Sequence, residues 1–355
     1  MPLRRKGDFG CMGVEQMVAT DSAFAVVQKN HGATTWGNFH GGNPSYYPLD
    51  AYFRCNRLKS IYTTRQAFAA CLVGGGVLAW GDPNSGGDSS EVHEKLDGRQ
   101  IKHIYSTQVA FAALMEDGDL ITWGNREGGG HWQRESDDQK VKHVVSTHEA
   151  FAAILENGGV EVWGKASHGG DSSAVRDRLS SGQVKQIFSN DAAFAAVMEK
   201  GGVVTWGSIT SGGDSSGVEK ELCGEKGVEQ IYSTSCAFAA VLQDGGVVTW
   251  GDPMRGGDCA YVQEKLNGNQ IKHIYSTEGA FAALLESGGV VVWGHDQFGG
   301  DSSGVDEKLN GKPIVKQIQS TSQAFAVVLE GGGLVTWGHA SFGGDSSAVQ
   351  GRLVC

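Results

Sequence analysis

The 355-residue sequence is poor in proline and in basic residues, and each scarcity excludes a class of protein. Proline occurs 6 times against 54 glycines, which does not fit collagen, and 40% hydrophobic residues do not fit a disordered chain. The formal net charge is −11, whereas duplex nucleic-acid binders use basic side chains to neutralise phosphate. The only basic cluster is Arg4, Arg5 and Lys6, so we expect no direct binding of nucleic acid.

The sequence also lacks long hydrophobic runs and paired cysteine motifs. The first 20 residues have no apolar stretch of the signal-peptide kind, and no run approaches a membrane span. Seven cysteines occur at irregular spacing without a C-x-x-C pair, which argues against a disulfide framework or a structural zinc site. We therefore expect reduced thiols in a soluble intracellular protein, cytoplasmic or nuclear, that is not inserted in a membrane.

What the sequence does contain is one segment repeated eight times. The dipeptide Trp-Gly recurs every 40 to 44 residues, and in each copy an Ala-Phe-Ala tripeptide places its phenylalanine 12 residues before the tryptophan. Such periodicity is typical of units that stack on their neighbours. We predict that these aromatic pairs form the structural core of the repeat: Phe24 and Trp36, Phe68 and Trp80, Phe111 and Trp123, Phe151 and Trp163, Phe194 and Trp206, Phe238 and Trp250, Phe281 and Trp293, Phe325 and Trp337.

The seventh repeat illustrates the local structure that we expect. Residues 271–277 alternate in polarity, residues 280–286 continue the β-prone pattern, and a Ser-Gly-Gly turn precedes a third strand at 290–293. In the segment that follows, Asp301 or Ser302 is suited to cap a short helical turn. Each repeat of about 43 residues therefore predicts three to four antiparallel strands and a short helical turn between blades.

These features predict an all-β fold, a closed β-propeller of eight blades. A single small sheet cannot bury both of its faces, and closing the ring removes exposed sheet edges. A seven-bladed ring and an open solenoid are the alternatives. We assign residues 1–13 to an N-terminal tail and 14–355 to a single propeller domain.

The run A-F-A-A-(L/V)-(L/M)-x-x-G-G-V-V-x-W-G resembles the repeat of the regulator of chromosome condensation family. The resemblance extends from Val14 to Leu353. The sequence departs from that family in having eight repeats, where members typically have seven blades, and in having Gly-Gly-Asp-Ser-Ser in place of a Gly-Gln-Leu-Gly turn. The resemblance implies a propeller. It leaves function open, because the family includes a nucleotide exchange factor, substrate-binding domains of ubiquitin ligases and enzyme inhibitors.

Strand direction predicts where a binding surface would lie. The loop after the first strand and the loop after Trp-Gly share one face of the ring, and these loops vary between repeats, whereas the opposite Gly-Gly turns are monotonous. The aromatic-rich loops of repeats 7, 8 and 1, together with the divergent loop of repeat 3, are the predicted binding sites. There are two alternatives to a binding surface. In one the loop sequences vary only because they are exposed to solvent, and in the other Phe298 and Phe342 pack on the next blade. The candidate residues are Phe39, His40, Tyr46, Tyr47, His295, Phe298, His339, Phe342, Arg126, His131 and Trp132.

No catalytic or metal motif occurs in the sequence. An aspartate recurs at one position of six repeats, but without the further carboxylates of a calcium loop, so we expect it to serve a turn or a helix cap. The aspartates are Asp88, Asp171, Asp214, Asp258, Asp301 and Asp345. No phosphate loop or dinucleotide fingerprint is present, so we predict no catalytic residues, no metal and no cofactor.

We therefore predict a non-catalytic protein-interaction scaffold that binds protein partners through the variable-loop face, as a subunit of a larger assembly or alone. One alternative, from the resemblance, is guanine-nucleotide exchange or another regulatory role for a small GTPase. A second is an enzyme with a site at the central channel, where histidines of adjacent blades could meet.

Overall fold

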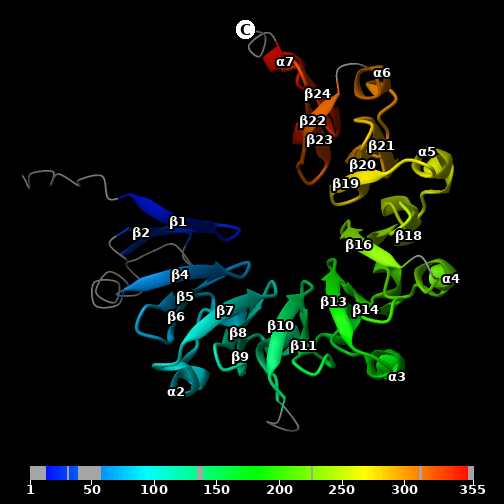
Figure 1. The fold of residues 1–355 in the computed structure, drawn as a ribbon. Helices are drawn as coiled ribbons and strands as arrows, with labels where there is room; N and C mark the ends of the chain where they lie inside the picture. Colours follow the sequence, from blue (N-terminus) through cyan, green and yellow to red (C-terminus); the bar gives the residue numbers. More distant parts are fainter. Residues whose placement is uncertain are drawn as a thin grey trace, which may run out of the picture. The chain divides into compact units, whose positions relative to one another are not determined.

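The computed structural model describes residues 13–29, 32–38, 57–133, 139–224, 227–311 and 314–350 (Figure 1). These residues form eight three-stranded antiparallel sheets, in each of which the strands follow one another in sequence order. The three strands per repeat predicted from the sequence are confirmed. We call the sheets blades 1 to 8, and together they give the chain its β-propeller fold.

The strands of blades 1 to 4 are β1 (Val14–Ala19), β2 (Ala23–Gln28), β3 (Ala33–Gly37), β4 (Leu58–Thr63), β5 (Ala67–Leu72), β6 (Val77–Gly81), β7 (Ile101–Ser106), β8 (Ala110–Met115), β9 (Leu120–Gly124), β10 (Val141–Ser146), β11 (Ala150–Leu155) and β12 (Val160–Gly164). Those of blades 5 to 8 are β13 (Val184–Ser189), β14 (Ala193–Met198), β15 (Val203–Gly207), β16 (Val228–Ser233), β17 (Ala237–Leu242), β18 (Val247–Gly251), β19 (Ile271–Ser276), β20 (Ala280–Leu285), β21 (Val290–Gly294), β22 (Val315–Ser320), β23 (Ala324–Leu329) and β24 (Leu334–Gly338).

Short helical segments follow the third strands. Most are single 3₁₀ turns: η1 (Pro83–Ser85), η2 (Ser90–Val92), η4 (Ala166–His168), η5 (Ser173–Val175), η6 (Ile209–Ser211), η7 (Ser216–Val218), η8 (Pro253–Arg255), η9 (Ala260–Val262), η10 (Asp296–Phe298) and η11 (Ala340–Phe342). The segment η3 (Arg126–Gly130) is a wider turn, and the α-helices are α2 (His93–Leu96), α3 (Arg176–Ser180), α4 (Glu219–Leu222), α5 (Gln263–Leu266), α6 (Asp306–Leu309) and α7 (Ser347–Gln350). The helical turn expected between blades is therefore present.

The pairing register explains the constant spacing of phenylalanine and tryptophan. In blade 7 Phe281 on β20 lies directly opposite Trp293 on β21, and the two rings stack with centroids 5.2 Å apart. A tight hairpin between the two strands fixes the number of residues that separate such partners. Both side chains are fully buried.

The core lies between successive blades. The face of β17 in blade 6 presents Ala237 and Ala239 to Phe281 and Trp293 of blade 7, with Leu266 of α5 completing the cluster. Alanine allows the close approach that the large rings of the next blade require. The aromatic pair of a blade is thus buried by the blade before it.

Blade 1 differs because no blade precedes it in the chain. Phe24 and Trp36 stack on each other at 5.3 Å, yet they remain 42% and 44% exposed. The corresponding aromatic pairs of blades 2 to 8 are all buried: Phe68, Trp80, Phe111, Trp123, Phe151, Trp163, Phe194, Trp206, Phe238, Trp250, Phe281, Trp293, Phe325 and Trp337.

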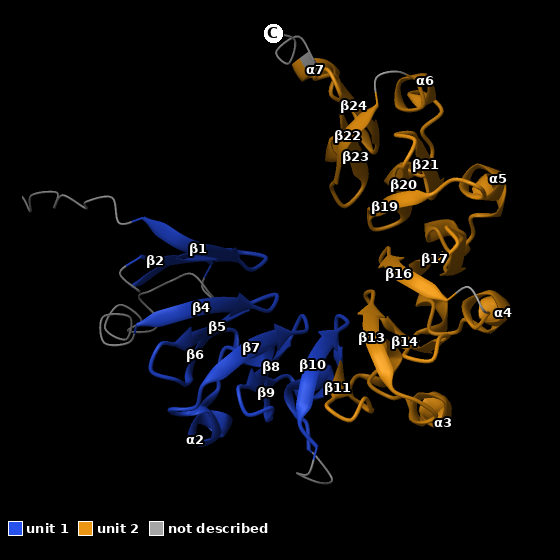
Figure 2. Ribbon diagram, viewed as in Figure 1, with its two compact units in different colours: residues 1–151 blue, residues 152–355 orange. Residues whose placement is uncertain are grey.

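The chain divides into two compact units, residues 1–151 (unit 1) and 152–355 (unit 2), and the boundary falls within β11 (Figure 2). Unit 1 holds blades 1 to 3, and unit 2 holds blades 5 to 8. Closure of the ring and the single domain over 14–355 stay predictions. Within the described residues, no helix is long and apolar enough to cross a membrane, and Cys71, Cys223, Cys236 and Cys259 are free thiols.

Candidate functional site

Two loops meet at one end of each blade and form the surface that we call the loop face: the loop after the first strand and the 3₁₀ segment after the third. In blade 7 the Thr277 hydroxyl donates to the carbonyl oxygen of Phe298 at 2.9 Å, and the N–H of His295 donates to Gly279 O at 2.9 Å. Strand direction predicted this meeting of loops. Equivalent side-chain bonds to a carbonyl join Thr64 to Ser85, Thr107 to Gly128, Asn190 to Ser211, Thr234 to Arg255 and Thr321 to Phe342.

Backbone hydrogen bonds tie the loop face of one blade to that of the next. In unit 2 the N–H of Asp191 donates to Ser235 O (3.3 Å), Ser235 N–H to Glu278 O (3.1 Å) and Glu278 N–H to Ser322 O (2.9 Å). In unit 1 the same relay joins Asp21 to Arg65, Arg65 to Gln108 and Gln108 to His148. These hydrogen bonds pair the backbone N–H and C=O groups of neighbouring loops and hold the loops in place. A rigid frame of this kind is a suitable support for a binding surface.

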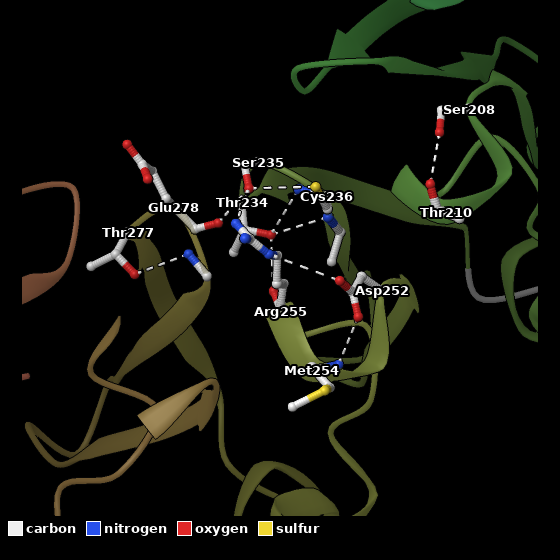
Figure 3. A network of polar contacts seen from close by, with 12 residues as sticks. Ser208, Thr210, Thr234, Ser235, Cys236, Asp252, Met254, Arg255, Thr277 and Glu278 are labelled. Carbon is white, nitrogen blue, oxygen red and sulfur yellow. Dashed lines mark hydrogen bonds and ion pairs between the residues drawn. The ribbon is translucent and has the colours of Figure 1, made fainter. Parts of the chain in front are cut away.

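Arg255 connects the loops of blades 6 and 7 (Figure 3). Its Nη1 donates to Ser235 Oγ at 3.0 Å, and Ser235 Oγ donates to Glu278 O at 2.6 Å. The guanidinium also faces the Asp252 carboxylate at 3.9 Å and lies 5.3 Å from the centroid of the Phe298 ring. The Arg255 side chain is therefore a fixed part of the loop face rather than a free surface cation.

Apolar side chains project from the 3₁₀ segments of unit 2. Ile209 of η6 is 74% exposed, Met254 of η8 is 69% exposed and Phe342 of η11 is 42% exposed. In Figure 3 the Met254 side chain extends away from the Arg255 network. Phe298 of η10 differs, because it is half-buried against the core of blade 8. Phe298 therefore packs on the next blade, which is the alternative given above for this residue.

The two predicted loop histidines cap the 3₁₀ segments that they precede. His295 Nδ1 accepts from the N–H of Gln297 and His339 Nδ1 from the N–H of Ser341, both at 3.2 Å. In blade 6 Asp252 fills the same role toward Met254 at 3.0 Å. Each ring also contacts the phenylalanine three residues on, edge to face, at 5.3 Å for His295 and 5.2 Å for His339. These histidines position the loop.

Among the candidate binding residues of repeats 1 and 3, the structure describes only those of repeat 3. Phe39, His40, Tyr46 and Tyr47 lie outside the described residues, so their place in a binding patch stays a prediction. In unit 1 the remaining candidates belong to blade 3: Arg126 and His131 are exposed, and Trp132 is half-buried with its backbone N–H bonded to Thr122 Oγ1 at 2.9 Å.

The recurring aspartates serve a turn. Asp301 Oδ1 accepts from the N–H of Ser303, two residues on, at 2.8 Å, which is an Asx turn rather than a cap of α6. The same bond is made by Asp88, Asp171, Asp214, Asp258 and Asp345. Backbone hydrogen bonding lowers the pKa of Asp171, Asp214 and Asp345. Across the described part of the chain, no group of histidines, cysteines and carboxylates is arranged to hold a metal.

A ladder of tyrosine and histidine side chains on the first strands was not predicted from the sequence. In unit 1 the Tyr62 hydroxyl of β4 lies 3.4 Å from His103 Nδ1 of β7, and the Tyr105 hydroxyl of β7 lies 3.1 Å from His143 Nδ1 of β10. Burial lowers the pKa of both imidazoles and raises the pKa of the Tyr105 hydroxyl. The recurring Lys-His-Ile-Tyr at 102–105 and 272–275 was the available signal.

No family model and no curated protein matches the chain. Solved structures that resemble it include the ectodomain of the receptor kinase CR4 from Physcomitrella patens, at 12% identity and a TM-score of 0.44, covering 79% of this chain and 72% of that one. Yeast RCC1 (Prp20) bound to Kap60 matches at 17% identity and 0.43, covering 68% and 70%. Human WBSCR16 matches at 16% and 0.42, covering 80% and 77%.

Proposed function

We propose that the chain is a non-catalytic interaction scaffold that binds a protein partner through the loop face of unit 2. The observation that carries this proposal is the exposure of three apolar side chains, Ile209, Met254 and Phe342, on 3₁₀ segments of that face. Large apolar side chains on a rigid frame are typical anchors of protein interfaces.

The frame supports the proposal because it lowers the entropy cost of binding. The relay of backbone bonds through Ser235 and Glu278, and the tie of Arg255 to Ser235, hold the loops before any partner arrives. A preorganised surface loses little freedom when it binds. His295 and His339 contribute by capping the segments that carry Phe298 and Phe342.

We also infer that the chain belongs to the regulator of chromosome condensation repeat class. The eight copies of the Ala-Phe-Ala and Trp-Gly pattern support this assignment. Regulation of a small GTPase is a narrower form of the same binding function. The identity of the bound partner distinguishes a GTPase regulator from a general scaffold.

The test is affinity capture from a lysate of the source cells with the full chain and with Ile209→Ser, Met254→Ser and Phe342→Ser combined. The three side chains are exposed, so the variant should fold, which circular dichroism checks. The matched control is Ile314→Ser, an apolar side chain 46% exposed beside the Gly288 turn at the opposite end of its blade.

We expect a stoichiometric partner with the wild type and the control, and a loss of about tenfold or more with the triple variant. A partner retained equally by all three proteins would contradict binding at this surface. Where the captured partner is a small GTPase, a nucleotide-release assay separates exchange activity from simple binding.

A further inference from the structure

The first strands of blades 2, 3 and 4 carry a row of positive side chains in an acidic protein. These strands, β4, β7 and β10, are neighbours within unit 1, and the Ser146 hydroxyl of β10 bonds directly to Ser106 O of β7 at 2.8 Å. The second residue of each strand is a lysine, Lys59, Lys102 or Lys142, and all three side chains are exposed. The whole chain has a net charge of −11, and this row places three lysines on neighbouring strands.

Aromatic and imidazole rings run along the same strands. Tyr62 and His103 meet edge to face at 5.0 Å, His103 and Tyr105 lie 4.6 Å apart, and Tyr105 meets His143 at 5.5 Å. The four rings therefore form one continuous ladder across three strands. The charge of Lys102 contributes to the low pKa of His143, so that lysine lies close to the ladder.

The Tyr62 and Tyr105 hydroxyls lie within hydrogen-bond distance of Nδ1 of the ladder histidines. Burial lowers the pKa of His103 and His143, so the neutral form of both imidazoles predominates at pH 7. A neutral imidazole whose Nδ1 accepts from a tyrosine hydroxyl carries its proton on Nε2. With the Tyr62 and Tyr105 hydroxyls as donors to Nδ1, the two Nε2–H groups are the hydrogen-bond donors that we assign to the ligand.

Lysine ammonium groups and Nε2–H groups are both donors, and none of these lysines forms an ion pair with a described carboxylate. The complementary ligand presents several anionic oxygens. We propose that β4, β7 and β10 bind an acidic peptide segment, whose carboxylates pair with Lys59, Lys102 and Lys142 and accept from His103 and His143.

Two features favour a peptide over a nucleic acid. The donors are distributed over three strands rather than converging on one point, which fits carboxylates spaced along an extended chain. The net charge of −11 opposes a long polyanion, whereas a short segment meets only the local row of lysines. The proposal does not rest on the loop face, because it uses strand residues of unit 1 alone.

The experiment measures the fluorescence anisotropy of a fluorescein-labelled hexaglutamate peptide titrated with the full chain at low salt. The test variant combines Lys59→Glu, Lys102→Glu and Lys142→Glu. The matched control combines Lys95→Glu, Lys265→Glu and Lys308→Glu, which makes the same change in net charge at exposed lysines of α2, α5 and α6. Circular dichroism confirms that both variants fold.

We expect the test variant to raise the Kd more than about tenfold and the control to change it less than about threefold. Equal losses in both variants would show a response to net charge and overturn the site. No binding by the wild type, or tighter binding of a single-stranded oligonucleotide of equal charge through the same lysines, would overturn the peptide as the occupant.

Two further variants separate the parts of the proposal. His103→Phe with His143→Phe keeps the rings but removes the Nε2–H donors, and we expect a Kd raised about threefold or more; wild-type affinity would overturn the role of the imidazoles. The loop-face variant with serine at 209, 254 and 342 should bind hexaglutamate like the wild type, so failure of either proposal leaves the other standing.

Discussion

The indole N–H of Trp250 donates to the carbonyl oxygen of Gly212 in the preceding blade, across 3.1 Å. Gly212 ends η6 in the left-handed conformation, at φ +89°, and its carbonyl is thereby aimed at the next blade. Trp250 is buried, so the bond joins the loop of one blade to the core of the following one. The same joint links Trp123 to Gly86, Trp206 to Gly169, Trp293 to Gly256 and Trp337 to Gly299.

Replacing Trp250 with phenylalanine should destabilise the chain by about 2–4 kcal/mol. The change leaves the Gly212 carbonyl without its buried donor, which costs about 1–3 kcal/mol, and the smaller ring adds a cavity. Urea unfolding followed by circular dichroism measures the loss. Val73→Ala, at a 43% exposed side chain in a turn, is the control and should change stability by less than about 0.5 kcal/mol. Equal losses of stability in the two variants would refute a stabilising role for the Trp250–Gly212 hydrogen bond.

Alanine at Gly256 should be far more harmful than alanine at Gly268. Both glycines have positive φ, +98° and +80°, so both changes carry the left-handed penalty of about 1–2 kcal/mol. At Gly256 the added Cβ would also lie 2.6 Å from Cδ2 of Phe281, whereas at Gly268 it would meet nothing within 4 Å. We expect Gly256→Ala to cost about 1–3 kcal/mol more than Gly268→Ala in urea unfolding. A difference near zero would mean that Phe281 moves aside freely.

The repeat made the blades predictable because each one is a local structure. The strands of blade 7 were expected at 271–277, 280–286 and 290–293, and they lie at Ile271–Ser276, Ala280–Leu285 and Val290–Gly294. The meeting of the two loops also followed from strand direction alone. Of the two roles expected for Asp301, a turn or a helix cap, the structure shows the turn, because α6 begins five positions further on.

Contacts between blades were not predictable, because they depend on residues about 40 positions apart. The Tyr62–His103 contact joins strands of two different blades, and the recurring Lys-His-Ile-Tyr segment does not indicate which residues meet. Within blade 6 the role of Arg255 was not predictable either, because its partner Ser235 lies 20 positions away in another loop. His295 was interpreted as part of an aromatic patch, but it caps η10, a position where aspartate is usual and histidine gives no clear signal.

Cys223 should react with iodoacetamide long before Cys71. Burial raises the pKa of Cys71 to about 11, so only about one part in a thousand would be thiolate at pH 8 even where the reagent could reach it. Cys223 is exposed. Mass spectrometry of peptides after timed alkylation should show modification of Cys71 slower by about a hundredfold or more, and equal rates for the two in urea. Comparable rates in the folded protein would contradict the burial of Cys71.

The Tyr–His ladder should make stability depend on pH. Burial, as the largest cause, lowers the folded-state pKa of His103 and His143 below the unfolded value of 6.5. The unfolded chain therefore binds more protons as the pH falls. The stabilising contribution is complete above pH 6.5 and is lost as the pH falls through the folded pKa. Lys102 on β7 strengthens the effect at His143, because its charge opposes a second positive charge nearby.

Glutamine is the matched replacement, because Gln186, Gln230 and Gln317 occupy the same position in blades 5, 6 and 8. We expect His103→Gln with His143→Gln to lose less thermal stability than the wild type between pH 7.5 and 5.5, by a Tm difference on the order of 1 °C. Differential scanning calorimetry at both pH values measures it. His93→Gln, at an exposed histidine of α2, should follow the wild type. If the ladder variant also follows the wild type, protonation of these two imidazoles is not coupled to folding.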